Sequence, residues 1–370
     1  MNLELTDEQV ALRDTARRFL AEKAPISTHV RALLEEPTGT TAAVWRGLAD
    51  LGTTGLLVPQ EYGGAGMTMV EAGIVAEELG AALHPGPWLS SAVAAPRALD
   101  RLGAGNAGAE LLTGIADGST IAAVGPLEPD GAAVTAAERD TEIVLRGEIA
   151  MPDAAAANVL LVFAETRFGT GLFAVQTDSP GVSMTPERGI DQTRKRFRVA
   201  LDDAVAQRLA APSEGAIAAV VDDVLIATAA DALGAARAVM DLAVEYAKVR
   251  TQFGQAIGSF QAIQHLCVDM YETVELARSG VIHALWAADN ADADERHFSA
   301  LRAKAFAGRL ATVGDTAIQV FGGIGYTWEH DAHLYLKRLL SWSEFLGGPD
   351  RYLTELGARL AHPDSKGAKP

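Results

Sequence analysis

The stretch RTQFGQAIGSFQAIQ, residues 250–264, combines residue types that suit a planar or phosphate-bearing ligand. Arg250 ends one helical pattern, and Gln252 and Phe253 precede the hinge glycine Gly254 before a second helical pattern opens. A guanidinium forms charge-assisted hydrogen bonds with phosphate, and an aromatic ring offers a face for packing. The stretch therefore predicts a ligand-binding junction between two helices.

Other motifs that would indicate a known chemistry are absent or lie in the wrong context. The chain has no P-loop and no Gly-x-Ser-x-Gly elbow, and GGIGY at 322–326 follows a helical pattern, whereas a dinucleotide fingerprint follows a strand. Cys267 falls among apolar residues, which predicts a core thiol and not a nucleophile. Glu329, His330 and His333 share a helical face, but no further His or Cys accompanies them, so we expect no metal site.

The composition indicates a large core and an acidic surface. Of 370 residues, 49% are apolar, and 31 basic against 48 acidic residues give a net charge of −17. Such a charge repels nucleic acid and anionic membrane surfaces, so we expect neither as a partner. The single cysteine excludes an intrachain disulfide, and the start MNLELTDEQV is acidic without an apolar run. We therefore expect a cytoplasmic protein.

The apolar patterns divide the chain into regions. Residues 1–117 carry helical patterns, residues 118–211 carry short segments rich in Val, Ile and Thr, and residues 212–361 are helical again. The sequence of residues 362–370 predicts a disordered tail. The fold class is therefore α+β and mostly α. We expect an N-terminal helical domain, a middle antiparallel β-barrel or sandwich, and a C-terminal four-helix bundle.

Two local patterns support this division. Thr6 and Gln9 have the spacing of a capping box at the start of the first helix. Beyond residue 259, apolar residues fall at alternating steps of three and four, which predicts a seam buried between helices. This seam consists of Phe260, Ile263, Cys267, Met270, Val274, Ala277 and Val281.

The chain resembles the acyl-CoA dehydrogenase family over nearly its whole length. The resemblance rests on LTDEQVALRDTARRFLAE, VPQEYGGAG, VAEELG, VEYAKVRTQFGQAIGSFQAIQHLCVDM and QVFGGIGYT. It implies a helix–barrel–helix fold, FAD as cofactor, an acyl-CoA thioester as substrate and an electron-transfer flavoprotein as acceptor. It also implies subunits paired as dimers within a tetramer, and a role in fatty acid or sterol side-chain degradation.

The resemblance assigns the opening stretch to the adenine and diphosphate half of an FAD site, presented to the flavin of a neighbouring subunit. Arg250 would pair with the diphosphate, and Phe253 would pack on the cofactor. Glycines in the second segment would let the backbone approach the ligand closely. The residues implied at this half-site are Arg250, Gln252, Phe253, Gln261, Gln319, Gly322 and Gly323.

The other half of the family's site, which cradles the flavin ring, looks different in this chain. Family members carry Thr-Glu-x-x-x-Gly-Ser-Asp and Trp-x-Thr/Ser there, whereas this chain has GPLEPDGAAVT and GEIAMPDAAAAN. The Gly-Ser-Asp is missing. Ala150, Met151 and Pro152 stand where an aromatic ring and a hydroxyl are expected.

The catalytic base of the family has no counterpart at its expected positions. In the family, a carboxylate removes the acyl α-proton while the β-hydride goes to flavin N5. Of its two locations, one is occupied here by Leu346 and the other, on the long helix before the arginine, by Val224. The nearest acids are Glu344 on a predicted loop and Asp223, which a one-residue offset turns by about 100° on a helix.

Three hypotheses follow. The leading one is a subunit of a heteromeric acyl-CoA dehydrogenase that supplies the ADP half of the FAD site to a related catalytic chain. The second is a self-sufficient homo-oligomeric dehydrogenase with Asp223 or Glu344 as base. The third is a flavin-free scaffold or binding protein of the same fold.

Overall fold

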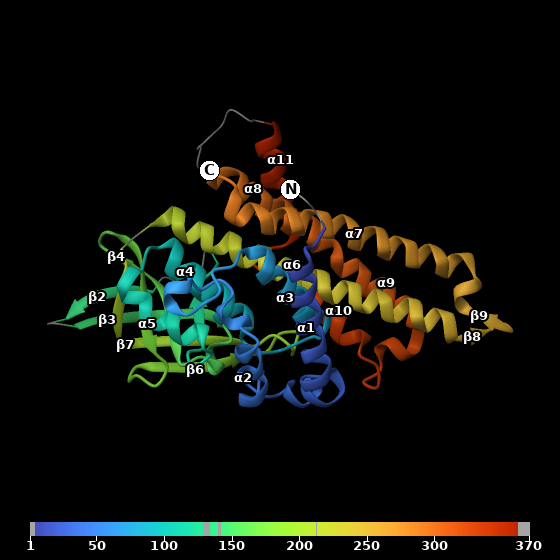
Figure 1. The fold of residues 1–370 in the computed structure, drawn as a ribbon, viewed down its shortest axis with the longest axis horizontal. Coiled ribbons are helices and arrows are strands. Elements are labelled where there is room, and N and C mark those ends of the chain that lie inside the picture. The colour runs from blue at the N-terminus through green and yellow to red at the C-terminus, as the bar shows by residue number, and fades with distance from the viewer. Residues whose placement is uncertain (1–3, 129–133, 140–141, 212, 362–370) are drawn as a thin grey trace.

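The structure is a computed structural model that describes residues 4–128, 134–139, 142–211 and 213–361. Helices form the N-terminal part, a strongly curved sheet forms the middle, and long helices form the C-terminal part (Figure 1). The predicted fold class is confirmed. The tail expected at 362–370 lies outside the described residues.

The N-terminal part is helical up to Ala116. Its first helix begins with the predicted capping box, in which Gln9 N donates to Thr6 Oγ1 and Thr6 N donates to Gln9 Oε1. The helices are α1 (Asp7–Lys23), α2 (Ala42–Asp50), α3 (Met69–Ala81), α4 (Ala95–Arg101) and α5 (Gly105–Ala116). Short 3₁₀ or π turns are η1 (Ile26–Val30), η2 (Arg31–Leu33), η3 (Thr53–Gly55), η4 (Gln60–Tyr62) and η5 (Leu89–Ala94).

The middle part is one sheet that closes on itself. Its path is β1-β4-β2-β3-β7-β5, β6 pairs with β7, and β5 also pairs with β4, which closes a barrel. Most pairings are antiparallel, but β1 and β2 both pair with β4 in parallel. The strands are β1 (Ala122–Gly125), β2 (Thr135–Arg139), β3 (Glu142–Pro152), β4 (Val159–Thr166), β5 (Gly169–Gln176), β6 (Val182–Glu187) and β7 (Arg196–Ala210), with η6 (Ala154–Ala156) after β3.

The C-terminal part is a helical bundle, and one end of it projects as an arm away from the sheet (Figure 1). Helix α6 runs out along this arm, a small hairpin turns the chain at the tip, and α7 runs back. None of the described helices is both long and apolar enough to cross a membrane. The elements are α6 (Glu214–Val249), β8 (Thr251–Gln252), β9 (Gln255–Ala256), η7 (Ile257–Ser259), α7 (Gln261–Asn290), α8 (Ala293–Ala307), η8 (Gly308–Leu310), α9 (Ala311–Phe321), η9 (Gly322–Tyr326), α10 (Ala332–Glu344) and α11 (Pro349–Ala361).

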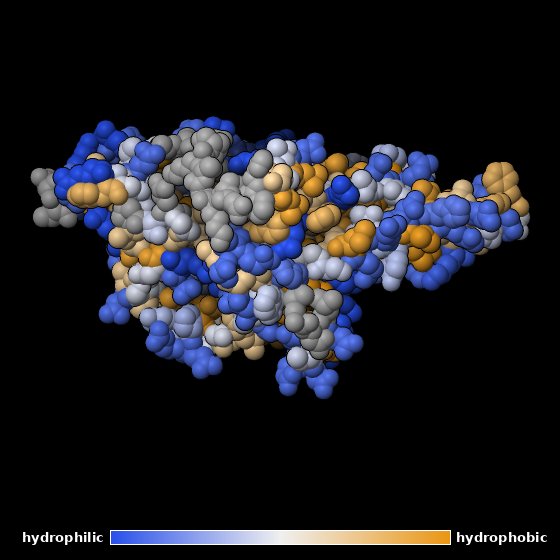
Figure 2. Space-filling model, turned by 90° about the horizontal axis from the view of Figure 1, so that it is seen from above, coloured by the Kyte–Doolittle hydropathy of each residue, from blue (hydrophilic) through white to orange (hydrophobic). Residues whose placement is uncertain are grey.

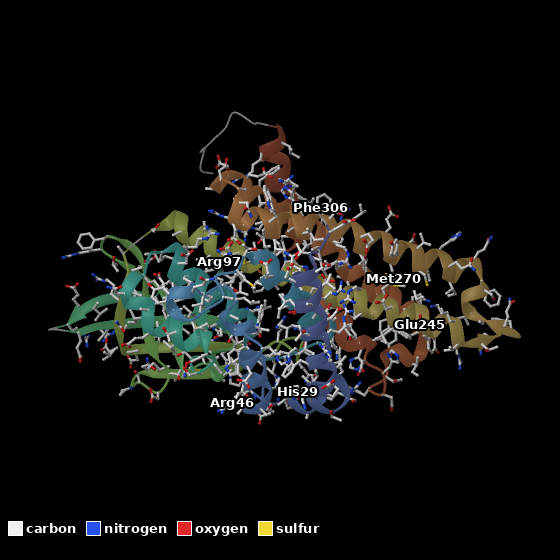
Figure 3. All side chains as sticks on the ribbon, viewed as in Figure 1. His29, Arg46, Arg97, Glu245, Met270 and Phe306 are labelled. Carbon is white, nitrogen blue, oxygen red and sulfur yellow. The ribbon has the colours of Figure 1, made fainter. Side chains whose placement is uncertain are left out.

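The predicted seam of α7 is buried only over its later part. Met270, Val274, Ala277 and Val281 are buried, and Met270 lies inside the bundle in Figure 3. Cys267 is half-buried and packs against the edge of the core, so the expected core position is met only in part. The first turns of α7 run along the arm, whereas α3 and α8 cover its later turns. Burial raises the pKa of the Cys267 thiol, which keeps it protonated at neutral pH.

Candidate functional site

The tip of the arm is a tight hairpin that displays Phe253 to solvent. Arg250 caps α6, its N–H donating to Tyr246 O, and the chain then turns back between β8 and β9. The two central residues of the turn, Phe253 and Gly254, both have positive φ, at 52° and 82°. Such a turn matches the twist of a two-stranded ribbon, but a positive φ is unusual for an aromatic residue. The Phe253 side chain is 92% exposed, with only an edge contact to Phe260.

A glycine-rich segment lies at the end of α9. Gln319 is exposed in the last turn, and the chain leaves the helix through Gly322 at φ 63° and ψ −142°, a conformation that favours glycine. A Cβ added at Gly322 or Gly323 would meet no atom within 4 Å. The backbone of this segment is therefore open to a ligand or to another chain.

An aromatic contact ties these two segments together. The Tyr246 ring lies one turn before Arg250, and its centroid is 5.1 Å from that of Phe321, the residue directly before Gly322. The His330 ring packs against the same Phe321 ring, with the two centroids 4.2 Å apart. The ends of α6 and α9 therefore lie side by side. All seven residues predicted for the ADP half-site, Arg250, Gln252, Phe253, Gln261, Gln319, Gly322 and Gly323, are solvent-exposed.

The residues at the two base positions are both buried, and neither can accept a proton. Val224 is buried on α6 and lines a cavity between the sheet and the bundle. Leu346 is buried just after α10, where its carbonyl accepts a hydrogen bond from the Tyr352 hydroxyl at 2.7 Å. Its neighbour Phe345 lines the same cavity as Val224.

Asp223 does not reach this cavity. Its carboxylate is fully buried and lies 3.0 Å from Arg101 Nε and 3.7 Å from Arg97 Nε, on the side of α6 that faces α4 (Figure 3, Arg97). Burial raises the pKa of Asp223, and the two guanidinium groups oppose that rise. This carboxylate links α4 to α6 and is turned away from the base position, as its one-residue offset predicts.

Glu344 also lies outside the cavity. It is the last residue of α10 and its side chain points to solvent. Below it, the ammonium of Lys304 is buried and donates to the carbonyl oxygens of Trp342 and Ser343, at 2.5 and 3.1 Å. Burial lowers the pKa of Lys304 to about 7. Lys304 thus caps the C-terminal end of α10, where helix carbonyls lack internal partners.

The cavity holds a group of buried ionic side chains that the sequence did not point to. Asp153 follows β3 at φ 58° and accepts a hydrogen bond from Ser90 Oγ at 2.5 Å. Burial raises the pKa of Asp153 to about 6. Arg194 Nη2 lies 2.5 Å from Asp231 Oδ2; burial opposes the charge on Arg194, but the neighbouring carboxylates, Asp231 first, outweigh it and raise its pKa. Ala150, Met151 and Pro152, the residues at the expected flavin cradle, line the same cavity.

The fit of a flavin can be judged separately for the two halves of the family's site, the arm and the cavity. The arm offers an exposed guanidinium, an exposed ring and unobstructed glycines, which fit an adenine and diphosphate. The chain's own cavity offers Met151 and Pro152 in place of an aromatic and a hydroxyl, with buried ions beside them. Its donor set does not match the cradle that the family uses.

The histidines considered for a metal take part in packing. His330 Nδ1 accepts a hydrogen bond from Ala332 N at 3.0 Å, and the Trp328 ring meets His333 edge-on with centroids 4.7 Å apart. Within the described part of the chain, no cluster of three or more His, Cys, Asp or Glu side chains could hold a metal ion.

Comparison with known proteins agrees with this architecture. A model described as acyl-CoA dehydrogenase, N-terminal domain, matches residues 6–119, and one described as acyl-CoA dehydrogenase, C-terminal domain, matches residues 225–361. Acyl-CoA dehydrogenase IpdE2 of Mycobacterium tuberculosis is 34% identical over 355 residues, which cover 96% of this chain and 98% of that protein.

Solved structures show the same fold along the full chain. The Tcur3481-Tcur3483 steroid ACAD variant has a TM-score of 0.88 at 30% identity, covering 97% of this chain and 99% of that one. The ChsE4-ChsE5 complex from Mycobacterium tuberculosis has a TM-score of 0.87 at 26% identity, covering 100% of both chains. With matching domains at both ends and a relative this similar along its length, the chain belongs to the acyl-CoA dehydrogenase family.

Proposed function

We propose that this chain is one subunit of a heteromeric, FAD-dependent acyl-CoA dehydrogenase. It supplies the ADP half of the FAD site and an apolar contact surface. A related partner chain supplies the flavin cradle, the acyl pocket and the catalytic base. The substrate is an acyl-CoA thioester, such as that of a fatty acid or sterol side chain, and the acceptor is an electron-transfer flavoprotein.

The observation that carries this proposal is the absence of a proton acceptor at both base positions. Val224 and Leu346 occupy them, Asp223 is held between two arginines behind α6, and Glu344 points to solvent. A general base must come within hydrogen-bond reach of the proton that it removes. Neither acid meets this condition, so the base is expected on the partner.

The arm supports the second part of the proposal. Its exposed apolar residues lie around the predicted half-site, and Figure 2 shows hydrophobic surface along the bundle and at its tip. Burying such a surface against a partner would place Arg250 and the α9 glycines over that partner's cofactor. The exposed residues include Val249, Phe253, Val268, Tyr271, Leu276, Ile324 and Tyr326.

The similar structures support a partner of the same fold. Two of them are named as pairs of different chains, Tcur3481-Tcur3483 and ChsE4-ChsE5. The flavin of such an enzyme, when bound, accepts the hydride from the acyl β-carbon. The residues of this chain then bind and orient: Arg250 pairs with diphosphate, Phe253 covers the cofactor, and the open backbone at Gly322 and Gly323 receives it.

Purification with and without a partner tests the proposal. The chain should be expressed alone and with a co-expressed acyl-CoA dehydrogenase chain that carries a base, and flavin absorbance and acyl-CoA turnover should be measured in both. We expect little flavin on the chain alone and about one FAD per pair of chains in the complex. One FAD per chain with turnover by the chain alone would establish the homo-oligomeric alternative. A complex without flavin would leave the scaffold alternative.

A further inference from the structure

The cavity between the sheet and the bundle is partly lined by apolar side chains, yet its ionic groups do not fit a flavin. Its apolar walls come from η5, β1, β3, α6 and the end of α10, so every part of the fold contributes. The walls include Leu89, Val124, Met151, Val224 and Phe345. A space of this kind favours a ligand that removes apolar surface from water.

The charges at the polar end of the cavity are balanced. Three carboxylates face three cationic groups there: Asp153, Asp191 and Asp231 against Arg194, Lys195 and Arg338. Toward one side, Glu128 and Arg196 form a further pair at 3.6 Å. An anionic or cationic ligand would add a charge with no counter-ion, and burying an unpaired charge is costly.

Two of these six ionic groups use most or all of their hydrogen-bond donors within the protein. Lys195 Nζ donates to three carbonyl oxygens, those of Leu33, Leu34 and Gln192. Arg338 donates to Asp231, Thr193 and His84.

Two buried atoms at the polar end are left without a hydrogen-bond partner among the described residues. One is a donor, Arg194 Nη2, whose close approach to Asp231 lacks hydrogen-bond geometry. The other is an acceptor, Asp191 Oδ2, on a carboxylate that is 3% exposed and whose Oδ1 accepts from Thr193. Buried polar atoms are normally satisfied. A hydroxyl group both accepts and donates, so it complements this pair.

We propose that this cavity binds a neutral, mainly apolar molecule that carries a hydroxyl group at one end. The hydroxyl accepts from Arg194 and donates to Asp191, while the apolar body packs against Met151, Val224 and Phe345. Burial alone already raises the pKa of Asp153 beside this site, which marks the surroundings as unfavourable to added negative charge. The inference rests on the proposed function, in which this chain's own cavity holds no flavin.

Three matched ring compounds test this site: 2-naphthol, naphthalene and 2-naphthoate, titrated into the full chain and into its flavin-loaded complex by calorimetry. We expect 2-naphthol to bind best. Naphthalene and 2-naphthoate should each bind roughly tenfold more weakly or worse, because one lacks the hydroxyl and the other adds a charge. Equal affinity for 2-naphthol and 2-naphthoate would overturn the assigned ligand class.

A variant that fills the cavity supplies a second, independent test. Val224→Phe should abolish 2-naphthol binding, whereas Val205→Phe, on the exposed face of β7, should leave it unchanged. Binding that survives Val224→Phe, or no binding of any compound by the folded protein because water alone fills the cavity, would overturn the inference. If FAD instead displaces 2-naphthol and fills every chain, the proposed function fails as well. A complex with one FAD per pair that binds no 2-naphthol refutes only the cavity ligand.

Discussion

Arg338 donates two hydrogen bonds to Asp231, from Nε to Oδ1 at 2.9 Å and from Nη2 to Oδ2 at 3.1 Å, and both side chains are almost fully buried. The same guanidinium donates to Thr193 beside the sheet and to the carbonyl of His84 in the N-terminal part. One side chain on α10 therefore holds all three parts of the fold together. Its removal would leave a buried carboxylate and a buried hydroxyl with fewer partners.

We predict that Arg338→Met lowers the free energy of unfolding by on the order of 3 to 5 kcal/mol, as expected for breaking a buried ion pair. Urea denaturation measures the change. Arg208→Met is the matched control, because Arg208 is exposed and lies 3.4 Å from Glu138, a surface pair worth about 1 kcal/mol at most. Equal effects of the two substitutions would refute the junction role of Arg338.

Asp153→Asn should stabilise the protein at neutral pH. Burial raises the folded-state pKa of Asp153 from its ordinary 3.8 to about 6, so the folded state holds this proton more tightly than the unfolded state does. The stability of the parent protein therefore falls as pH rises from 3.8 to 6, and asparagine removes that loss. The gain above pH 6 should be on the order of 2 to 3 kcal/mol, and it should vanish near pH 4.

The control for Asp153 is Asp203→Asn. Asp203 also has a positive φ, at 54°, but it lies at the surface of the sheet between Arg139 and Arg146, and hydrogen bonding to Arg146 lowers its pKa. Losing that carboxylate should leave the melting temperature at neutral pH unchanged or lower. Melting curves at several pH values distinguish the two cases. A rise for both variants would point to the turn conformation and not to buried charge.

Arg250→Ala should weaken FAD retention by the assembled enzyme. Loss of a charged hydrogen bond to diphosphate costs roughly 1.5 to 3 kcal/mol, which is about tenfold or more in affinity. Equilibrium dialysis of the complex measures it. Lys248→Ala, at an exposed lysine paired with Glu245 on the same end of α6, should leave affinity unchanged. Unchanged FAD affinity in Arg250→Ala would show that Arg250 only ends helix α6 and does not bind the cofactor.

Glu344→Gln should leave turnover of the assembled enzyme within a few-fold of the parent. Asp223→Asn should do the same per mole of bound FAD, although it weakens the links to Arg97 and Arg101 and lowers stability. Loss of a true general base costs about 100- to 10,000-fold. A decrease of that size by Glu344→Gln, with FAD still bound, would make this chain catalytic in its own right.

The parts of the fold that were predictable are those with local causes. The Thr6–Gln9 cap and the helical repeat of the bundle depend on residues a few positions apart. Strand β6 was not predicted, because its apolar alternation is limited to Val182 and Met184, none of its side chains is fully buried, and it contains Pro186. The tip hairpin was not predicted either, since Phe253–Gly254 lacks the Asn-Gly or Asp-Gly signal of such turns.

The cavity could not have been located from the sequence, because its groups are distant along the chain. Ser90, Asp153, Arg194, Asp231 and Arg338 come from every part of the fold, and nothing in their spacing announces a contact. Each looks like an ordinary surface charge or hydroxyl until the three parts pack together. The incomplete burial of the first three seam residues, Phe260, Ile263 and Cys267, was hidden for a similar reason, since periodicity shows which face is apolar and not what covers it.

The hairpin at the end of the arm has a consequence for how cells must supply this protein. A subunit that presents Phe253, Tyr326 and Val249 to water, at 92%, 71% and 74% exposure, carries an adhesive tip for as long as it lacks a companion. If the proposed pairing holds, we expect surplus copies to self-associate through this tip. Under the proposed heteromeric function, we therefore expect matched synthesis of the two chains to favour soluble enzyme, and yield to follow the scarcer of the two.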